Sequence, residues 1–106
     1  MPHLEDDWKA LGRLCDRLRS TPETRLVRAD DRLSGGSLSD AVHQAAVWAA
    51  ATQGIDQPVP RLHPLASADQ LSVLGGDFLR WVASGDDHQA SLHEWRTLID
   101  RLRAVV

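Results

Sequence analysis

Apolar residues recur at the spacing of an α-helix over four separate segments of this chain, and no segment alternates in the manner of a β-strand. The first and last segments carry arginine and acidic residues away from the stripe, as helices on the surface of a folded core do. We therefore expect the stripes to be buried and the charged faces to be exposed. The expected core includes Leu11, Leu14, Leu18, Val42, Ala45, Leu71, Leu74, Phe78, Leu98, Ile99 and Leu102, and the expected exposed set includes Arg13, Glu94, Arg101 and Arg103.

The four stripes predict helices at about 4–19, 38–53, 68–84 and 88–103. Proline after Thr21 is typical of a first helical turn, so a short extra helix is expected near 22–28. The fold class is all-α: a compact four-helix bundle of the up-and-down type with two long connections. Since 106 residues is a common size for one domain, 1–106 is expected to form a single helical domain.

The ends of these helices carry recognisable capping residues. The pattern from Ser67 to Gln70 resembles a capping box, in which Gln70 reaches back to the start of its helix. Residues 56–65 contain three prolines, which predicts an extended, semi-rigid connection. The other expected caps are Ser37 or Ser39, Gly54, and Asp86 or Asp87.

Each long helix carries one tryptophan, and the third also carries a Gly75-Gly76 pair. We expect the tryptophans in the core or at its edge, with one or two lining a partner surface or ligand cleft as the alternative. Each glycine costs about 1 kcal/mol in a helix. Gly75 therefore indicates close helix packing, with a kink or a glycine-lined ligand pocket as the other interpretations.

The second long helix is apolar nearly all round, which is typical of a helix buried on more than one side. Either it is the central helix of the monomer, covered by the two connections, or its outer face meets a second copy or another protein. The second explanation predicts a homodimer or a protein partner. Its candidate interaction surface is Val47, Ala50, Ala46 and Trp48.

No catalytic, metal-binding or nucleotide-binding pattern is present in the sequence. His88 and His93 are five positions apart, which places them on different sides of a helix, and the remaining histidines are isolated. Cys15 falls on the apolar stripe and is expected to be an inert buried thiol. We expect no enzymatic activity, no cofactor and no metal.

Charge and hydropathy disfavour further classes of protein. The longest apolar run has seven residues, from Ala45 to Ala51, whereas a membrane span needs about 20. The acidic N-terminus and the single cysteine favour a cytoplasmic protein. Basic residues are almost all arginine, and residues with AT-rich codons are scarce, which indicates a gene from a high-GC bacterium.

The net charge of −3 and the acids interleaved among Arg19, Arg25, Arg28 and Arg32 disfavour nucleic-acid binding. The sequence thus predicts a non-enzymatic interaction module that self-associates or docks on another protein. A small-ligand-binding bundle with a tryptophan-lined cleft is the alternative, and a nucleic-acid-binding regulator is the third.

Overall fold

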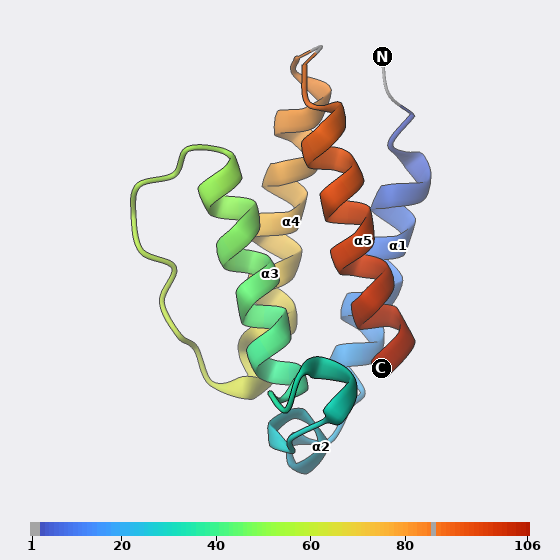
Figure 1. Cartoon of the computed structure of the whole chain (residues 1–106), viewed down its shortest axis with the longest axis vertical. Coiled ribbons are helices and arrows are strands. Elements are labelled where there is room, and N and C mark those ends of the chain that lie inside the picture. Colours follow the sequence, from blue (N-terminus) through green and yellow to red (C-terminus); the bar gives the residue numbers. More distant parts are fainter. Residues whose placement is uncertain (1–2, 86) are drawn as a thin grey trace.

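The computed structural model describes residues 3–85 and 87–106. These residues fold into four long α-helices and one short α-helix (Figure 1). The predicted segments are confirmed to within one or two residues. Within the described part there is no strand, and one isolated antiparallel bridge joins Ala29 to Ser37. The helices are α1 (Glu5–Arg19), α2 (Glu23–Val27), α3 (Leu38–Thr52), α4 (Ser67–Ala83) and α5 (Gln89–Val105), with 3-10 turns η1 (Asp31–Leu33) and η2 (Pro64–Ala66).

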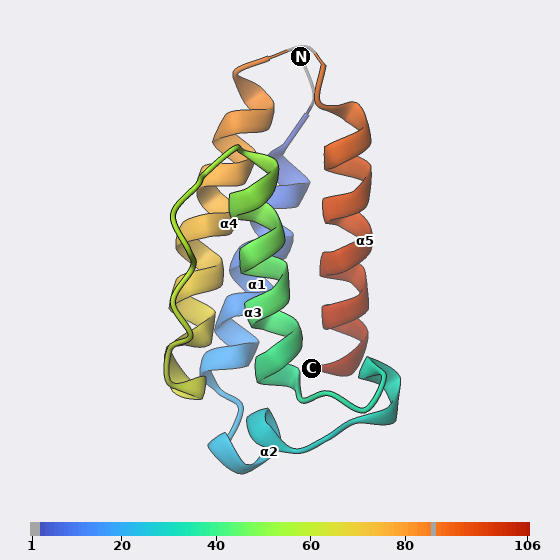
Figure 2. The same ribbon diagram turned by 60° about the vertical axis from the view of Figure 1, so that its left-hand side comes forward.

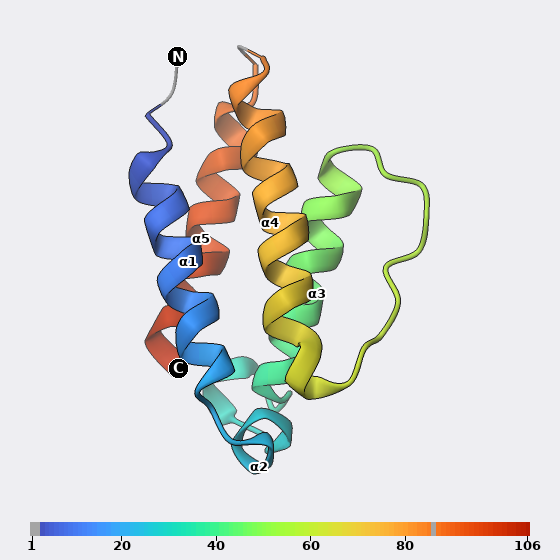
Figure 3. The same ribbon diagram turned by 180° about the vertical axis from the view of Figure 1, so that it is seen from behind.

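The long helices form a bundle in which α1 packs on α4 and α5, and α3 packs on the same two helices. The pairs α1–α3 and α4–α5 therefore lie on the diagonals. Helices α3 and α4 run in the same direction, while α1 and α5 run the opposite way (Figures 1 and 3). The up-and-down expectation is wrong, because the chain returns to the starting end of α3 before α4 begins.

The connector, residues 54–63, makes this return along the outside of the bundle (Figure 2). A helix of fifteen residues is about 22 Å long, and ten extended residues reach about 33 Å. The connector is therefore long enough to pass the whole of α3. Its two prolines, Pro58 and Pro60, favour the extended conformation that this path requires.

Side chains from three helices attach the connector to the bundle. Gln70 Nε2 donates a hydrogen bond to the Pro60 carbonyl at 2.8 Å, and Gln70 Oε1 lies 3.3 Å from His43 Nδ1 of α3. Arg61 pairs with Asp40, and His63 Nε2 lies 3.1 Å from Glu23 Oε1 in α2. The capping box expected for Gln70 is wrong, because η2 leads directly into α4 and leaves Gln70 to bind the connector.

The caps expected at the two ends of α3 are observed. Ser37 Oγ accepts from the Asp40 N–H at 3.0 Å, and Asp40 accepts from the Ser37 N–H, so α3 begins with a capping box. Gly54 has the left-handed φ of +79° that follows the end of α3. The cap expected at Asp87 is wrong, because the residue preceding α5 is His88, which makes no capping bond through its side chain, and Asp86 lies outside the described residues.

The centre of the bundle is filled by aromatic rings. Trp95 of α5 lies across the diagonal against Phe78 of α4, with ring centroids 5.1 Å apart, and Trp48 of α3 lies 5.2 Å from Phe78. Gly75 admits Trp95 to this position, which confirms close helix packing at that glycine. Trp95 is fully buried, Trp48 and Trp81 are half-buried, and Trp8 is partly exposed on α1.

Burial follows the predicted stripes, with two exceptions. Nine of the eleven residues expected in the core are buried, and the four residues expected at the surface are exposed. Leu74 and Leu98 are only half-buried. Each of them lines a hollow on the surface of the bundle, as described below.

No described helix combines the length and the apolar character that a membrane span requires.

Candidate binding surfaces

The four candidate residues of α3 lie in different environments. Ala46 and Ala50 are 0% and 2% exposed, Val47 is 39% exposed, and Trp48 is half-buried. Ala50 lines a hollow under the connector, and Trp48 lines a groove between α3 and α5. The structure does not bring the four residues together on one surface.

The outward orientation expected for Ala46 and Ala50 is wrong. Helix α3 packs most extensively against α4, and it also contacts α5 and α2. Ala46 and Ala50 are therefore buried within the monomer. Val47 remains the exposed large apolar side chain of α3.

The first surface is a hollow of about 450 Å³ between the connector and α4. Three large apolar side chains that are exposed, Ile55, Leu62 and Val73, line it together with Leu74. Its one charged residue, Asp69, is bound by Arg19, with Arg19 Nη2 at 2.9 Å from Asp69 Oδ1. The hollow is therefore an apolar surface whose single carboxylate is already paired.

Val47 is not among the residues that line this hollow. It precedes Ala50, which does line it, by three positions, so the two residues are neighbours on the helix surface. We call the surface formed by Val47, Ile55, Leu62 and Val73 the connector face.

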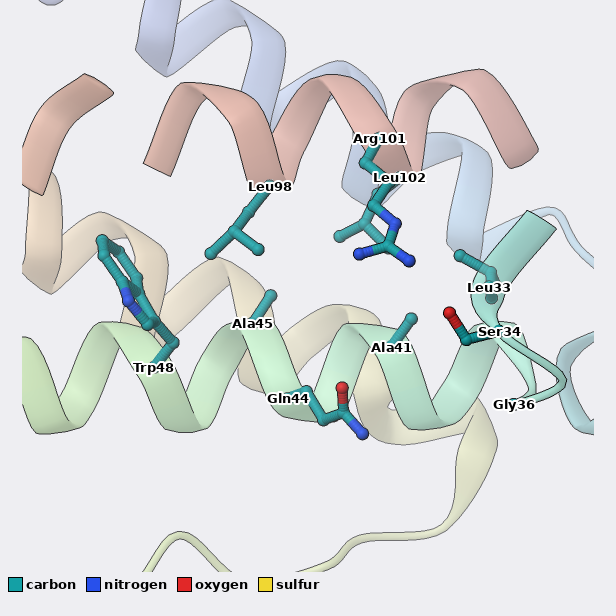
Figure 4. A pocket seen from close by; sticks show the side chains of 10 residues that line it. All are labelled: Leu33, Ser34, Gly36, Ala41, Gln44, Ala45, Trp48, Leu98, Arg101 and Leu102. Carbon is teal, nitrogen blue, oxygen red and sulfur yellow. The ribbon is translucent and has the colours of Figure 1, made fainter. Parts of the chain in front are cut away.

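The second surface is a groove of about 480 Å³ between α3 and α5, closed at one end by the loop after α2 (Figure 4). Ala45 and Ala41 of α3 lie opposite Leu98 and Leu102 of α5, and the small alanine side chains leave space between the two helices. Arg101 is the one charged residue of the lining. The remaining lining residues are Leu33, Ser34, Gly36, Gln44 and Trp48.

Trp48 forms a fixed wall at the other end of this groove. Its Nε1 donates to Glu94 Oε2 at 3.0 Å, and its ring is stacked on Trp95 with centroids 6.3 Å apart and planes 22° apart. The indole is thus held by α5 on one edge and by the aromatic core on one face.

Basic residues of the segment 19–32 are largely occupied by intramolecular partners. Arg19 binds Asp16 and Asp69, and Arg32 binds Asp30 through two nitrogen atoms. Arg25 donates to the Val105 carbonyl at 3.1 Å. These contacts leave no continuous basic strip along this segment.

The groups with potential reactivity are isolated. Burial raises the pKa of the Cys15 thiol to about 11, which keeps it protonated and weakly nucleophilic at neutral pH. Among residues 3–85 and 87–106, no three His, Cys, Asp or Glu side chains are grouped so that they could hold a metal ion.

Sequence reasoning named Val47, Trp48 and Ala50 but missed the other residues that define the two surfaces. Ile55 and Leu62 belong to the proline-rich connection, where no periodicity marks them as part of a face. Val73 and Arg101 lie on the outer sides of their helices and become lining residues only through the path of the connector and the spacing of α3 from α5. The one sequence signal that could have indicated the connector face was the presence of apolar residues within the proline-rich segment.

No family model matches the chain, and no curated protein and no solved structure is significantly similar to it.

Proposed function

We propose that the protein is a non-enzymatic interaction module that self-associates as a homodimer through the connector face. The observation that carries this proposal is the gathering of Ile55, Leu62 and Val73 in one hollow while all three remain exposed. Contiguous apolar surface on a folded protein is typical of a contact site, whereas single exposed apolar residues are not.

A second copy of the chain is the partner that this shape favours. A two-fold contact uses the same patch on both subunits, so the patch must contain both a recess and a group that enters the partner's recess. The connector face contains both, because Val73 is 62% exposed at the edge of the hollow that it lines.

The charges around the hollow agree with a contact between identical surfaces. Asp69 is paired with Arg19 in the monomer, so two copies can approach without bringing two unpaired carboxylates together. The expected energy then comes from removal of the apolar side chains from water.

Molar mass in solution tests the proposal. We expect light scattering to give a dimer for the unmodified chain and a monomer for Val73→Glu, with the same helix content by circular dichroism. The control is Val27→Glu, which adds the same charge at an exposed valine of α2, outside the hollow. This variant should remain dimeric.

A monomer for the unmodified chain over the micromolar to millimolar range overturns self-association. A dimer that is dissociated by Val27→Glu but not by Val73→Glu overturns the choice of surface.

A further inference from the structure

We propose that the groove between α3 and α5 binds a small amphiphilic carboxylate, whose apolar chain lies between Trp48 and Leu33 and whose head group pairs with Arg101. This site is separate from the connector face, and the proposal does not depend on self-association. It rests on the charge, the rigidity and the dimensions of the groove.

Arg101 is a cation without an assigned partner. The ion pairs within residues 3–85 and 87–106 include the neighbouring Arg103, which binds Asp100, but none includes Arg101. Its guanidinium extends from α5 across the groove toward α3 (Figure 4). A guanidinium in this position can bind a carboxylate through two parallel hydrogen bonds.

The lining offers nothing that would repel such a head group. No acidic residue lines the groove, and its other polar side chains are Ser34 and Gln44. In Figure 4 Ser34 lies at the same end as Arg101, while the Gln44 side chain is directed away from the groove. The groove therefore combines one positive charge with an apolar trough, which is complementary to one negative charge on an apolar chain.

Both ends of the groove are held in place before any ligand arrives. Trp48 is fixed by Glu94 and Trp95 at one end. At the other end the Asp30 carboxylate binds the Arg32 guanidinium, and the Asp30 N–H donates to the Gly36 carbonyl at 3.0 Å. A preformed site loses less conformational entropy on binding, which favours a small ligand of low contact area.

The dimensions indicate a medium-length chain. The groove volume of about 480 Å³ lies within the range of sites for small molecules. Along α3 the seven positions from Ala41 to Trp48 span roughly 10 Å. That length suits an extended aliphatic chain with its carboxylate beside Arg101 and its tail against the Trp48 ring.

Decanoate is the probe for this proposal, used below its micelle-forming concentration. We expect saturable binding by calorimetry, together with a shift of the Trp48 indole N–H resonance, which Trp48→Phe identifies. Decanol supplies the same chain without the charge, and acetate supplies the charge without the chain. Both should bind at least about tenfold more weakly, since a charge-assisted hydrogen bond and apolar burial each contribute substantially.

Two variants assign the site. Arg101→Gln should weaken decanoate binding about tenfold, whereas Arg103→Gln, an arginine two positions away that does not line the groove, should leave it unchanged. Ala41→Phe should fill the groove and abolish binding. Circular dichroism checks that each variant keeps its helix content.

The proposal is overturned if decanoate does not bind saturably or if decanol binds equally well. It is also overturned if Arg101→Gln and Arg103→Gln weaken binding to the same extent. Binding that survives Ala41→Phe but is lost in Val73→Glu places the ligand in the connector hollow and likewise rejects this site. A loss of decanoate binding leaves the mass of the protein unaffected, so the two proposals fail separately.

Discussion

The indole ring of Trp95 lies against the backbone of Gly75, where a Cβ atom would be 2.8 Å from Trp95 Cη2 and 3.1 Å from Leu11 Cδ2. Trp95 is buried against Phe78 and Trp48 and has no space into which it can move. Gly75→Ala should therefore lower the free energy of unfolding. The added methyl group should overpack the core at a cost of about 1–3 kcal/mol. The higher helix propensity of alanine offsets about 1 kcal/mol of this cost.

Two other helical glycines provide matched controls for chemical denaturation. A Cβ on Gly76 would meet Trp8 Cζ3 at 3.4 Å, an ordinary contact, and a Cβ on Gly12 would meet nothing within 4 Å. Alanine at either position should be neutral or stabilising by up to about 1 kcal/mol. Equal effects at all three glycines would contradict the role assigned to Gly75.

The Asp7–Arg96 pair joins α1 to α5. Arg96 Nε and Nη2 donate to the two Asp7 carboxylate oxygens at 2.9 and 2.8 Å, and Asp7 is only 8% exposed. A double-mutant cycle with Asp7→Asn and Arg96→Gln should give a coupling energy of about 0.5–1 kcal/mol, limited by the exposure of the arginine. The control cycle is the fully solvated pair Glu5–Lys9, which should couple by less. A coupling as small as that of Glu5–Lys9 would remove Asp7–Arg96 as a tie between the helices.

Acid should weaken the α2–α3 loop and the start of α3. The Arg32 guanidinium lowers the pKa of Asp30 from its ordinary 3.8 to about 2, and Arg61 lowers the pKa of Asp40. Because these carboxylates hold their protons less tightly in the fold, the stability they contribute is present above about pH 4 and is lost as the pH falls toward 2.

Thermal unfolding followed between pH 2 and 5 measures this loss. Asp30→Asn and Asp40→Asn should each show a smaller decrease in Tm with acidification than the unmodified chain. The control is Asp31→Asn, at an exposed carboxylate next to Asp30. Identical pH profiles for Asp30→Asn, Asp40→Asn and the unmodified chain would show that these carboxylates do not couple to folding.

Adjacent residues of α3 should respond oppositely to a charge. Val47→Glu places the carboxylate at a side chain that is already 39% exposed, so the helix content should be retained. Ala46→Glu buries an unpaired charge inside the bundle, which costs several kcal/mol and should unfold the chain. Circular dichroism separates the two results, and unfolding by Val47→Glu would contradict the observed orientation of α3.

Addition of zinc, iron or manganese should leave the Tm unchanged, because no grouped ligands in the described residues favour the folded state by binding a metal. Differential scanning calorimetry with and without a chelator makes the comparison. A saturable rise of several degrees at micromolar metal would require a site that these residues do not form.

Local sequence signals were sufficient for the positions of the helices and for the caps of α3. The apolar stripe of α1 and the Ser37–Asp40 capping box depend on residues within one or two turns of each other, so their spacing in the sequence predicts them. The direction of α4 is not local information. A proline-rich connection of ten residues is compatible with either a return along α3 or a loose turn, and the attachment of Gln70 to Pro60 and His43 is visible only after folding.

The binding surfaces were less predictable for the same reason. Leu74 and Leu98 have the spacing of core residues, yet each faces a region where two elements do not close completely over it. Ala46 and Ala50 have the spacing of an outer flank, yet both are buried in the monomer, in which α3 packs most extensively against α4. Periodicity shows which residues share a face, but the helix that covers this face depends on topology.

The order of the helices around the bundle makes folding depend on contacts between distant parts of the chain. Helices α4 and α5 are joined by a short loop but lie diagonally opposite each other in the bundle. The contact between α3 and α4 forms only after the connector has spanned the bundle. The contacts of α1 with α4 and α5 bring the first helix together with the last two. Each contact between two long helices therefore closes a long loop of chain. The closure costs conformational entropy before the packing of the two helices stabilises the fold. We expect this chain to fold more slowly than bundles of equal size assembled from helical hairpins, in which contact order is low.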